Sequence, residues 1–352
     1  MYIDIHVHDR DFTQSHKETV SHALEVARDS GLDAILVMPN TSPAITTEEQ
    51  VKARLQLRKD AKVPEVFYGI YIGATSNPEQ LKRAVELYKK YPEVIGMKLY
   101  AGESVGDLAV INPTEQLRVF ETLSNEGYNG ILAIHAEKEE NMHKEIWNAL
   151  VPISHCIARP ARAETESIKD IIYFAKATNY KGPIHIAHIS THEGVMLVNQ
   201  AKKEGLDFSS SVCPHHLFYD LRKMLKPNGI AFKVNPPLRS EEEPNLLLED
   251  LREGRIDCIE TDHAPHSKKE KLEHPFMSGI VSLWAWPLFE RYLQIKGFSE
   301  KRISGATYEW QRQRYNLDVS KTKRPIKNRS SDYPINHWTG LEEMLRLNNP
   351  LL

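Results

Sequence analysis

The chain has 352 residues, of which 41% are hydrophobic and 26% are charged, and its formal net charge is -3. These values are ordinary for a globular protein that buries a large core. Because the sequence has no basic block and no apolar run long enough to span a bilayer, we expect neither nucleic acid nor a membrane as a partner.

Short apolar runs rich in β-forming residues alternate with amphipathic segments along most of the chain. Strands are expected at 2–8, 34–38, 66–73, 94–100, 130–136, 183–190, 207–212 and 258–264. Helical periodicity lies between them, for example over 16–30 and 114–125, and helix starts are expected near 46–47 and 77–78. This alternation predicts a parallel sheet, and about eight repeats close it into a (β/α)8 TIM-type barrel. An open doubly wound sheet is the alternative, but no glycine-rich phosphate loop occurs.

The C-terminal part is predicted to contain two more helices, over 278–296 and 299–310. From about residue 316 the sequence becomes polar and contains prolines. We therefore expect a single barrel domain over 1–310 and a tail over 311–352 that packs on the barrel.

Polar side chains suited to metal binding stand at the ends of five predicted strands. They are His6, His8, Lys98, His135, His188 and Asp262. The carboxyl ends of barrel strands converge on one mouth, and strand alternation puts the first two histidines on the same face. Each residue alone has an ordinary explanation, such as a buried histidine or a surface lysine. Together they indicate a site for two zinc-type ions, which can share and activate one water.

Lys98 is the unusual member of this set, because an ammonium group repels cations. Its ordinary pKa lies near 10.4, so it must lose its proton to contribute. Two neighbouring dications favour the neutral amine, which can add CO2. The resulting carbamate is anionic and could bridge both ions.

Eight motifs follow one another between residue 6 and about residue 280. They are HVHDRD at 6–11, MPNTSPA at 38–44, GMKLYAGES at 96–104, IHAE at 134–137, HIAHIST at 185–191, CPHHLF at 213–218, KVNPPLR at 233–239 and TDHAPH at 261–266. In this order they resemble the dihydroorotases of the amidohydrolase superfamily.

The resemblance implies two zinc ions per chain. The two histidines of HVH would hold the more buried ion, and the histidines of IHAE and of AHIST the more exposed one. Carboxylated Lys98 would bridge both ions. Asp262 would bind the buried ion and act as general base and general acid.

The resemblance also implies a substrate pocket for a small molecule. The family interconverts N-carbamoyl-L-aspartate and L-dihydroorotate in pyrimidine biosynthesis. Arg10, Asn40 and His266 would hold the substrate carboxylate, because a guanidinium group offers a bidentate fork for it. Asn235 would contact the ring, as would the backbone near Gly279. A homodimer and an association with aspartate carbamoyltransferase are both compatible with the resemblance.

Several positions depart from the family pattern. Asp9 follows the HVH motif, where the family usually has an apolar residue. Val281, Ser282, Trp284 and Ala285 replace the usual Pro-Gly and Glu-Thr residues, so we expect an altered far wall of the pocket.

Two further features have no assigned role. The small β-sandwich of most relatives is expected to be missing or vestigial, with INHWTGLE at 335–342 as its remnant. The resemblance implies no ligand role for His215 and His216, and one of them is a candidate for orienting a metal ligand.

The cysteines bear on the compartment. Cys156, Cys213 and Cys258 are odd in number and widely spaced, and none forms a CxxC pair. This pattern is typical of free thiols in a reducing compartment. The N-terminal residues also lack the pattern of a signal peptide. We therefore expect a cytoplasmic protein.

Two other functions are weighed against dihydroorotase. Hydantoinases and allantoinases hydrolyse related cyclic amides with the same metal set, but they lack an arginine at the position of Arg10 and an MPNT motif. A non-catalytic dihydroorotase-like subunit that scaffolds a partner would typically have lost metal ligands. All six are present in this chain.

Overall fold

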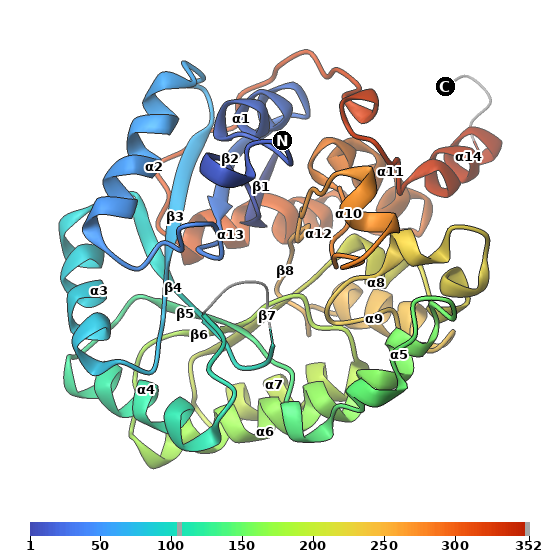
Figure 1. Ribbon diagram of the computed structural model, residues 1–352. Coiled ribbons are helices and arrows are strands. Elements are labelled where there is room, and N and C mark those ends of the chain that lie inside the picture. The colour runs from blue at the N-terminus through green and yellow to red at the C-terminus, as the bar shows by residue number, and fades with distance from the viewer. Residues whose placement is uncertain (104–107, 349–352) are drawn as a thin grey trace.

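The computed structural model describes residues 1–103 and 108–348. Eight parallel strands form one sheet in the order of the sequence, and helices surround it (Figure 1). The strands are β1 (Tyr2–Val7), β2 (Leu32–Val37), β3 (Phe67–Gly73), β4 (Val94–Tyr100), β5 (Ile131–His135), β6 (Ile184–Ile186), β7 (Phe208–Val212) and β8 (Cys258–Ile259). A parallel bridge between Val7 and His263 brings the segment after β8 back to β1. The predicted (β/α)8 barrel is therefore confirmed.

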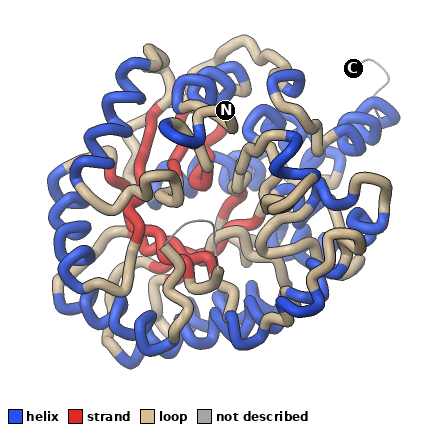
Figure 2. The backbone as a smooth tube through the Cα atoms, in the orientation of Figure 1, coloured by secondary structure: helices blue, strands red, loops and turns tan. Residues whose placement is uncertain are grey.

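Helices connect successive strands on the outside of the barrel, as Figure 2 shows. The longer ones are α1 (Val20–Asp29), α2 (Glu48–Asp60), α3 (Pro78–Lys90), α4 (Pro113–Asn125), α6 (Ala161–Ala177), α7 (His192–Lys203), α9 (Glu243–Arg252), α11 (Trp286–Ile295) and α14 (Thr339–Asn348). The shorter ones are α5 (Ser154–Ala158), α8 (Pro214–Phe218), α10 (Lys268–Leu272), α12 (Glu300–Ser304) and α13 (Trp310–Arg314). Local sequence sets several starts: the side chains of Thr19 and Asn77 accept hydrogen bonds from the first turns of α1 and α3.

Two apolar clusters fill the molecule. The larger one lies between the sheet and the helices and includes Val7, Leu24 and Phe120. The smaller one fills the inside of the barrel and includes Ile3 and Ile5. The barrel interior is therefore a packed core below the mouth, as expected for this fold.

Two strands are much shorter than predicted, because residues predicted to bind a metal leave the strand conformation. β6 ends at Ile186, and two residues later His188 has a φ of 38°. β8 ends at Ile259, and Asp262 has a φ of 49°. The backbone N–H groups of His188 and Thr261 donate to the side-chain carboxylates of Glu260 and Asp4, so they no longer extend the sheet ladder.

The predicted helix over 278–296 is wrong in its first part. Residues 278–282 are not helical: Ile280 bridges His263, and the Gly279 N–H donates to the Lys233 carbonyl at 2.9 Å. A 3-10 turn (Leu283–Ala285) and α11 follow. The helix predicted over 299–310 runs on to Arg314, through α12, a π-helical turn (Gly305–Glu309) and α13. Pairing with the segment after β8 overrides the helical pattern of the sequence around Gly279.

The C-terminal part contacts the barrel at several places. The Arg324 guanidinium donates to the Leu32 carbonyl at 2.7 Å, and Arg329 forms an ion pair with Asp29 at 2.8 Å. The Trp338 Nε1–H donates to the Val281 carbonyl at 2.7 Å. Within 1–103 and 108–348, every named strand belongs to the barrel sheet. The division into a barrel over 1–310 and a tail over 311–352 stays a prediction, and the last four residues of that tail lie outside the described ones.

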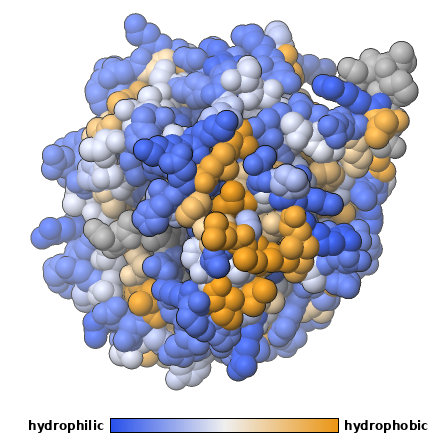
Figure 3. Space-filling model, turned by 45° about the vertical axis from the view of Figure 1, so that its right-hand side comes forward, coloured by the Kyte–Doolittle hydropathy of each residue, from blue (hydrophilic) through white to orange (hydrophobic). Residues whose placement is uncertain are grey.

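The surface is mostly hydrophilic, with an apolar area on the face that Figure 3 shows. Leu150, Val151 and Ile157, near α5, are among the exposed large apolar residues. Of the helices in the described part of the chain, none has both the length and the apolarity needed to cross a membrane.

Candidate active site

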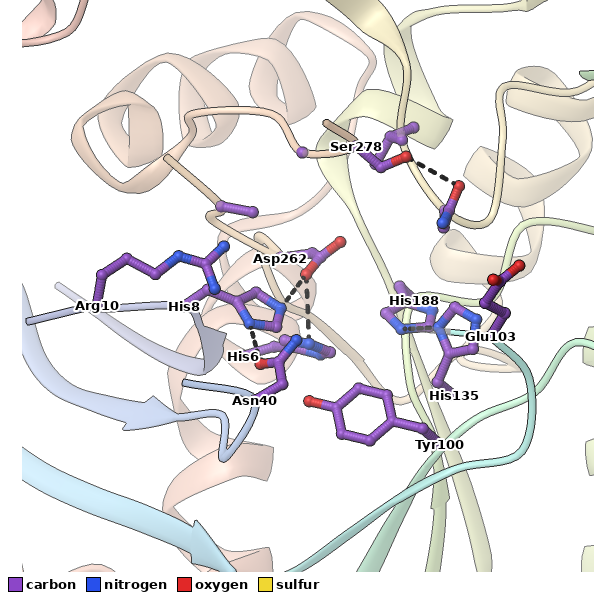
Figure 4. A pocket seen from close by; sticks show the side chains of 14 residues that line it. His6, His8, Arg10, Asn40, Tyr100, Glu103, His135, His188, Asp262 and Ser278 are labelled. Carbon is purple, nitrogen blue, oxygen red and sulfur yellow. Dashed lines mark hydrogen bonds and ion pairs between the residues drawn. The ribbon is translucent and has the colours of Figure 1, made fainter. Parts of the chain in front are cut away.

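A cavity of about 60 Å³ opens at the carboxyl ends of the strands, where the predicted metal ligands meet (Figure 4). Its lining residues are His6, His8, Arg10, Asn40, Tyr100, Glu103, His135, His188, Val234, Asn235, Asp262, Ala264, Ser278 and Gly279. Nine of the eleven site residues expected from the sequence are in this lining. The other two, Lys98 and His266, are buried and lie outside it. Ser104, the last residue of the GMKLYAGES motif, lies outside the described residues.

A β-bulge in β1 aims both histidines of the HVH motif into the cavity. Asp4 pairs with Ile35 and Val7 pairs with Val37, so β1 uses one residue more than β2 over this stretch. Ile5 packs inside the barrel, whereas Val7 packs outside it. The extra residue changes the phase of the strand, so that His6 follows Ile5 toward the interior.

His6, His8 and Asp262 form a buried group of potential metal donors. One donor atom from each lies within 4.8 Å of the other two. Asp262 Oδ1 lies 2.8 Å from His8 Nε2 and 3.3 Å from His6 Nε2. Burial alone favours the protonated carboxyl, but the two histidines outweigh it and hold the pKa of Asp262 below its ordinary value.

The contacts of His8 fit a shared cation. The amide oxygen of Asn40 lies 2.7 Å from His8 Nδ1, so Nδ1 carries the proton. Burial lowers the pKa of His8 to about 4, and a neutral ring has only one N–H to donate. His8 Nε2 and the Asp262 carboxylate therefore face each other as two electron-rich groups, which suits a metal ion as their common partner.

His135 and His188 form a second pair on the far side of the cavity. His135 Nδ1 lies 3.2 Å from His188 Nε2, and His135 Nε2 lies 3.0 Å from a Glu137 carboxylate oxygen. Burial lowers the pKa of both histidines, so both rings are neutral and offer lone pairs. The Nδ1 atom of His188 is buried and has no hydrogen-bond partner.

Lys98 lies in β4 with its side chain fully buried. Its Nζ atom has no hydrogen-bond partner, and burial lowers its pKa to about 8. With a pKa of about 8, part of the Lys98 amine is uncharged near neutral pH. An uncharged amine can react with CO2, whereas a lysine ammonium group cannot. The donor set fits the metal ions that the sequence predicts. Lys98 Nζ and His188 Nδ1 fit them as well, because both atoms are buried without a hydrogen-bond partner among the described residues.

Backbone strain coincides with two of these donors. His188 and Asp262 both have positive φ, in the left-handed region that non-glycine residues rarely adopt. Such a conformation costs on the order of 1–3 kcal/mol and persists where the surroundings enforce it, often at functional sites.

Two carboxylates that the sequence analysis did not identify contact the potential metal donors. Glu260 lies 3.1 Å from His6 Nδ1 and accepts a 2.6 Å hydrogen bond from the His188 N–H. Asp4 accepts hydrogen bonds from the His6 and Thr261 N–H groups. The sequence offered one signal for Glu260: it lies two residues before Asp262 in CIETDHA, on the same face of the strand predicted there.

The residues expected to bind a carboxylate lie on the side of the cavity where β1, β2 and the segment after β8 adjoin. The Arg10 side chain is 3% exposed, and neither a hydrogen bond nor an ion pair joins its guanidinium group to the described residues. His266 Nε2 lies 3.0 Å from the Ser278 carbonyl, and its Nδ1 has no partner. Burial and then the charges of Arg10 and Lys17 lower the pKa of His266, which reports a positive potential in this region.

Asn235 and Gly279 also line the cavity, and both lie next to Ser278. The Asn235 amide oxygen accepts a hydrogen bond from Ser278 Oγ at 3.2 Å. Gly279 has a φ of 148°, and a Cβ atom there would lie 2.6 Å from the Ala264 carbonyl oxygen. Only glycine therefore fits at this position.

The departures from the family pattern have structural explanations. Tyr68 donates to the Asp9 carboxylate, and Arg54 contacts Asp9 and donates to the Arg10 carbonyl at 2.6 Å. Asp9 thus belongs to a buried polar network that holds the backbone of Arg10. None of the residues in the 281–285 segment lines the cavity, and Val281 contacts His337 and Trp338 instead. The altered far wall of the pocket stays a prediction.

Comparisons with known proteins agree with this site. No protein-family model matches the chain. A dihydroorotase from Lactobacillus gasseri is 33% identical over 271 residues, which cover 76% of this chain and 61% of the relative. A dihydroorotase from Staphylococcus epidermidis is 31% identical over 314 residues, which cover 84% of this chain and 68% of the relative. The chain thus spans about three fifths of the length of the first of these relatives.

Solved structures share the fold. An L-hydantoinase (dihydropyrimidinase) from Arthrobacter aurescens has a TM-score of 0.78 at 23% identity, covering 93% of this chain and 74% of that one. A dihydroorotase from Saccharomyces cerevisiae in complex with 5-fluoroorotic acid has a TM-score of 0.72 at 17% identity, covering 91% and 85%. At these identities the two structures show the fold alone. The sequence relatives go further, and with 31% identity across 68% of a curated relative, the chain belongs to the dihydroorotase family.

Proposed function

We propose that the protein is a zinc-dependent dihydroorotase, which reversibly cyclises N-carbamoyl-L-aspartate to L-dihydroorotate. The observation that carries this proposal is the buried guanidinium group of Arg10 beside His8 and Asp262, which has no hydrogen-bond or ion-pair partner among the described residues. A buried cation without a partner is costly, so the pocket needs an anionic ligand at this place. Dihydroorotate has a carboxylate next to its cyclic amide and meets that need.

The proposal includes two zinc ions per chain. His6, His8 and Asp262 would hold one, and His135 and His188 the other, with carboxylated Lys98 shared between them. When bound, zinc acts as a Lewis acid and lowers the pKa of water toward neutrality.

Asp262 is the proposed general base and general acid. One of its carboxylate oxygens contacts both histidines of the HVH motif, and the other points into the cavity (Figure 4). Its lowered pKa keeps it ionised, so it can take a proton from the attacking water. In the hydrolytic direction it then passes this proton to the ring nitrogen as the amide C–N bond breaks.

The remaining residues orient the substrate. Arg10, Asn40 and His266 would hold the carboxylate at the side of positive potential. Asn235 and the Gly279 backbone would contact the ring. Asn40 has a second task, because its amide oxygen also fixes the proton of His8 on Nδ1.

The test compares the turnover of dihydroorotate, hydantoin and allantoin side by side, with zinc supplied. We expect turnover of dihydroorotate and little of the two ureides that lack its carboxylate. Preference for hydantoin or allantoin would instead assign a hydantoinase-like cyclic amidase. A protein with no turnover and little bound zinc would be the non-catalytic subunit.

Location and assembly are also proposals. The three cysteines are free and buried, which fits a cytoplasmic enzyme. A homodimer or a complex with aspartate carbamoyltransferase can be tested by sedimentation of the protein alone and with that enzyme.

A further inference from the structure

A second group of potential metal donors lies where β7 meets α8. Cys213 ends this strand segment, Pro214 begins the helix, and His215 and His216 lie in its first turn. All three donors are buried, and one ligand atom from each lies within 4.8 Å of the other two. Within the described residues, the other such group is His6, His8 and Asp262, so the two groups share no residue.

The two histidines have ring nitrogens without a hydrogen-bond partner in the described part of the chain. Both nitrogens of His215 are buried without a hydrogen-bond partner, and so is Nδ1 of His216. The other nitrogen of His216 donates to the Pro236 carbonyl at 3.1 Å, which leaves Nδ1 with a lone pair. Buried polar atoms without a partner are rare in proteins and often indicate a bound ion or water.

The charges around this group favour a cation. Burial lowers the pKa of His216 to about 4 and that of His215 well below its ordinary value, so both rings are neutral donors. Burial raises the pKa of the Cys213 thiol, and the carboxylates of Glu260 and Asp262 act on it in the same direction. These two carboxylates supply negative charge close to the sulfur, which offsets the charge of an incoming dication.

We propose that Cys213, His215 and His216 form a further metal site, distinct from the proposed zinc pair, for a divalent ion such as zinc. One sulfur and two imidazoles are a donor set that zinc and cobalt(II) favour. On binding, the Cys213 S–H proton leaves to solvent, the sulfur binds the ion, and the two rings bind through their lone pairs without any redox change. The site rests on its own geometry and stands whether or not the protein turns over dihydroorotate.

Such a site would have a structural role next to the substrate pocket. His216 already holds the Pro236 carbonyl, and Asn235 of the same loop lines the cavity. An ion at the start of α8 would fix the ring of His216, and through it the loop that carries Asn235.

Cobalt(II) is the probe for the test. The full-length protein is stripped with a chelator and titrated with cobalt(II), while bound cobalt and the near-ultraviolet spectrum are measured. A cobalt–thiolate bond produces a charge-transfer band, and the His6 group contains no sulfur. We therefore expect the band in the wild-type protein. Cys213→Ser should lose it and bind one cobalt ion fewer per chain.

Matched variants complete the design, because the chain has only three cysteines. Cys156→Ser and Cys258→Ser should keep the band and the cobalt content of the wild type. His215→Asn should keep the sulfur yet bind one ion fewer and lose the band. A cobalt-loaded wild type without the band, or a band that persists in Cys213→Ser, would overturn the proposal. Should Cys213→Ser fail to fold by circular dichroism, the wild-type spectrum and the His215→Asn variant still decide.

Discussion

On the metal side of the pocket, every histidine has a ring nitrogen in contact with another polar group of the protein. His8 contacts Asp262, His6 contacts Glu260, and His135 contacts Glu137. On the carboxylate side, His266 Nε2 contacts the Ser278 carbonyl, but the Arg10 Nε atom and the His266 Nδ1 atom have no hydrogen-bond partner among the described residues. The protein itself thus holds the histidine rings, whereas the guanidinium group of Arg10 is left for a ligand to complete.

The two sides also differ in what holds them. The proposed metal ligands stand at strand ends or shortly after them, and buried carboxylates contact the rings of His6, His8 and His135. The carboxylate side depends on loops: a buried network fixes Arg10 from behind, and the C-terminal segment supports the loop of Gly279. Changes on the metal side should therefore affect all substrates, and changes on the carboxylate side mainly the anionic one.

The largest effect is expected for Asp262→Ala. If Asp262 is the general base and acid, as proposed, its loss should lower kcat for dihydroorotate by about 1000-fold or more, within the range of about 10²–10⁴ that such catalysis contributes. The histidines should retain at least one zinc ion, which metal analysis measures. Activity within about tenfold of wild type, a loss of only ~1.4 kcal/mol in barrier, would exclude this role for Asp262.

Lys98→Ala is expected to come next. Without this shared anionic ligand, turnover should fall by roughly 100-fold or more. Even the loss of a residue that only hydrogen-bonds to a metal ligand costs about 10–100-fold. Some zinc should be lost too. Short carboxylic acids added to the assay should partly restore activity, because they can replace the carbamate. An unmodified Lys98 amine in a well-resolved zinc-loaded structure would contradict the carbamate.

Arg10→Met tests the carboxylate side directly. It should lower kcat/KM for dihydroorotate by more than ~30-fold, because an unpaired carboxylate in a partly desolvated site costs about 2–5 kcal/mol. Neutral cyclic ureides should be affected far less. Equal losses for both kinds of substrate would mean that Arg10 serves the fold or the metals, and that the two sides of the pocket do not differ as described.

How far the sequence could predict this site follows from the same comparison. The proposed metal ligands stand at strand ends, and the carboxyl ends of barrel strands must converge, so their meeting follows from the topology. The bulge in β1 was not predictable, because the residues of YIDIHVH fit a regular strand equally well. Glu260 was missed because its role depends on contact with His6, which lies 254 positions earlier.

For the loop around Gly279, the sequence pattern predicted the wrong local structure. Its apolar spacing runs into α11 and predicts a helix from residue 278, but Ile280 pairs with His263 instead. Tertiary pairing overrode local periodicity at the place where the backbone reaches the pocket. The network of Asp9 was likewise visible in the sequence only as a departure from a pattern.

Tyr68→Phe sharpens the role of that network. It removes the hydroxyl that donates to the buried Asp9 carboxylate, which should cost about 1–3 kcal/mol in the free energy of unfolding. Because Arg10 should then be held less firmly, KM for dihydroorotate should rise severalfold. Tyr71→Phe is the matched control, since it loses a buried contact with Tyr315 inside the barrel. It should lower stability and leave KM unchanged; a similar rise in KM for both variants would contradict a positioning role of Asp9.

The smallest effect concerns His337, which supports the loop of Gly279. Its Nε2–H donates to the Ala231 carbonyl, its Nδ1 accepts from the Val281 N–H, and burial lowers its pKa to about 3. The unfolded chain takes up a proton on His337 below about pH 6.5, whereas the folded protein does not until about pH 3. Stability must therefore fall as the pH falls through this window.

His337→Gln keeps both hydrogen-bonding functions without the titration. Between pH 7 and 5 its free energy of unfolding in urea should fall by about 1–2 kcal/mol less than that of the wild type. Between pH 7 and 8 the difference between the two proteins should stay constant. Parallel curves down to pH 5 would mean that His337 is protonated in the folded protein and that the loop has another support.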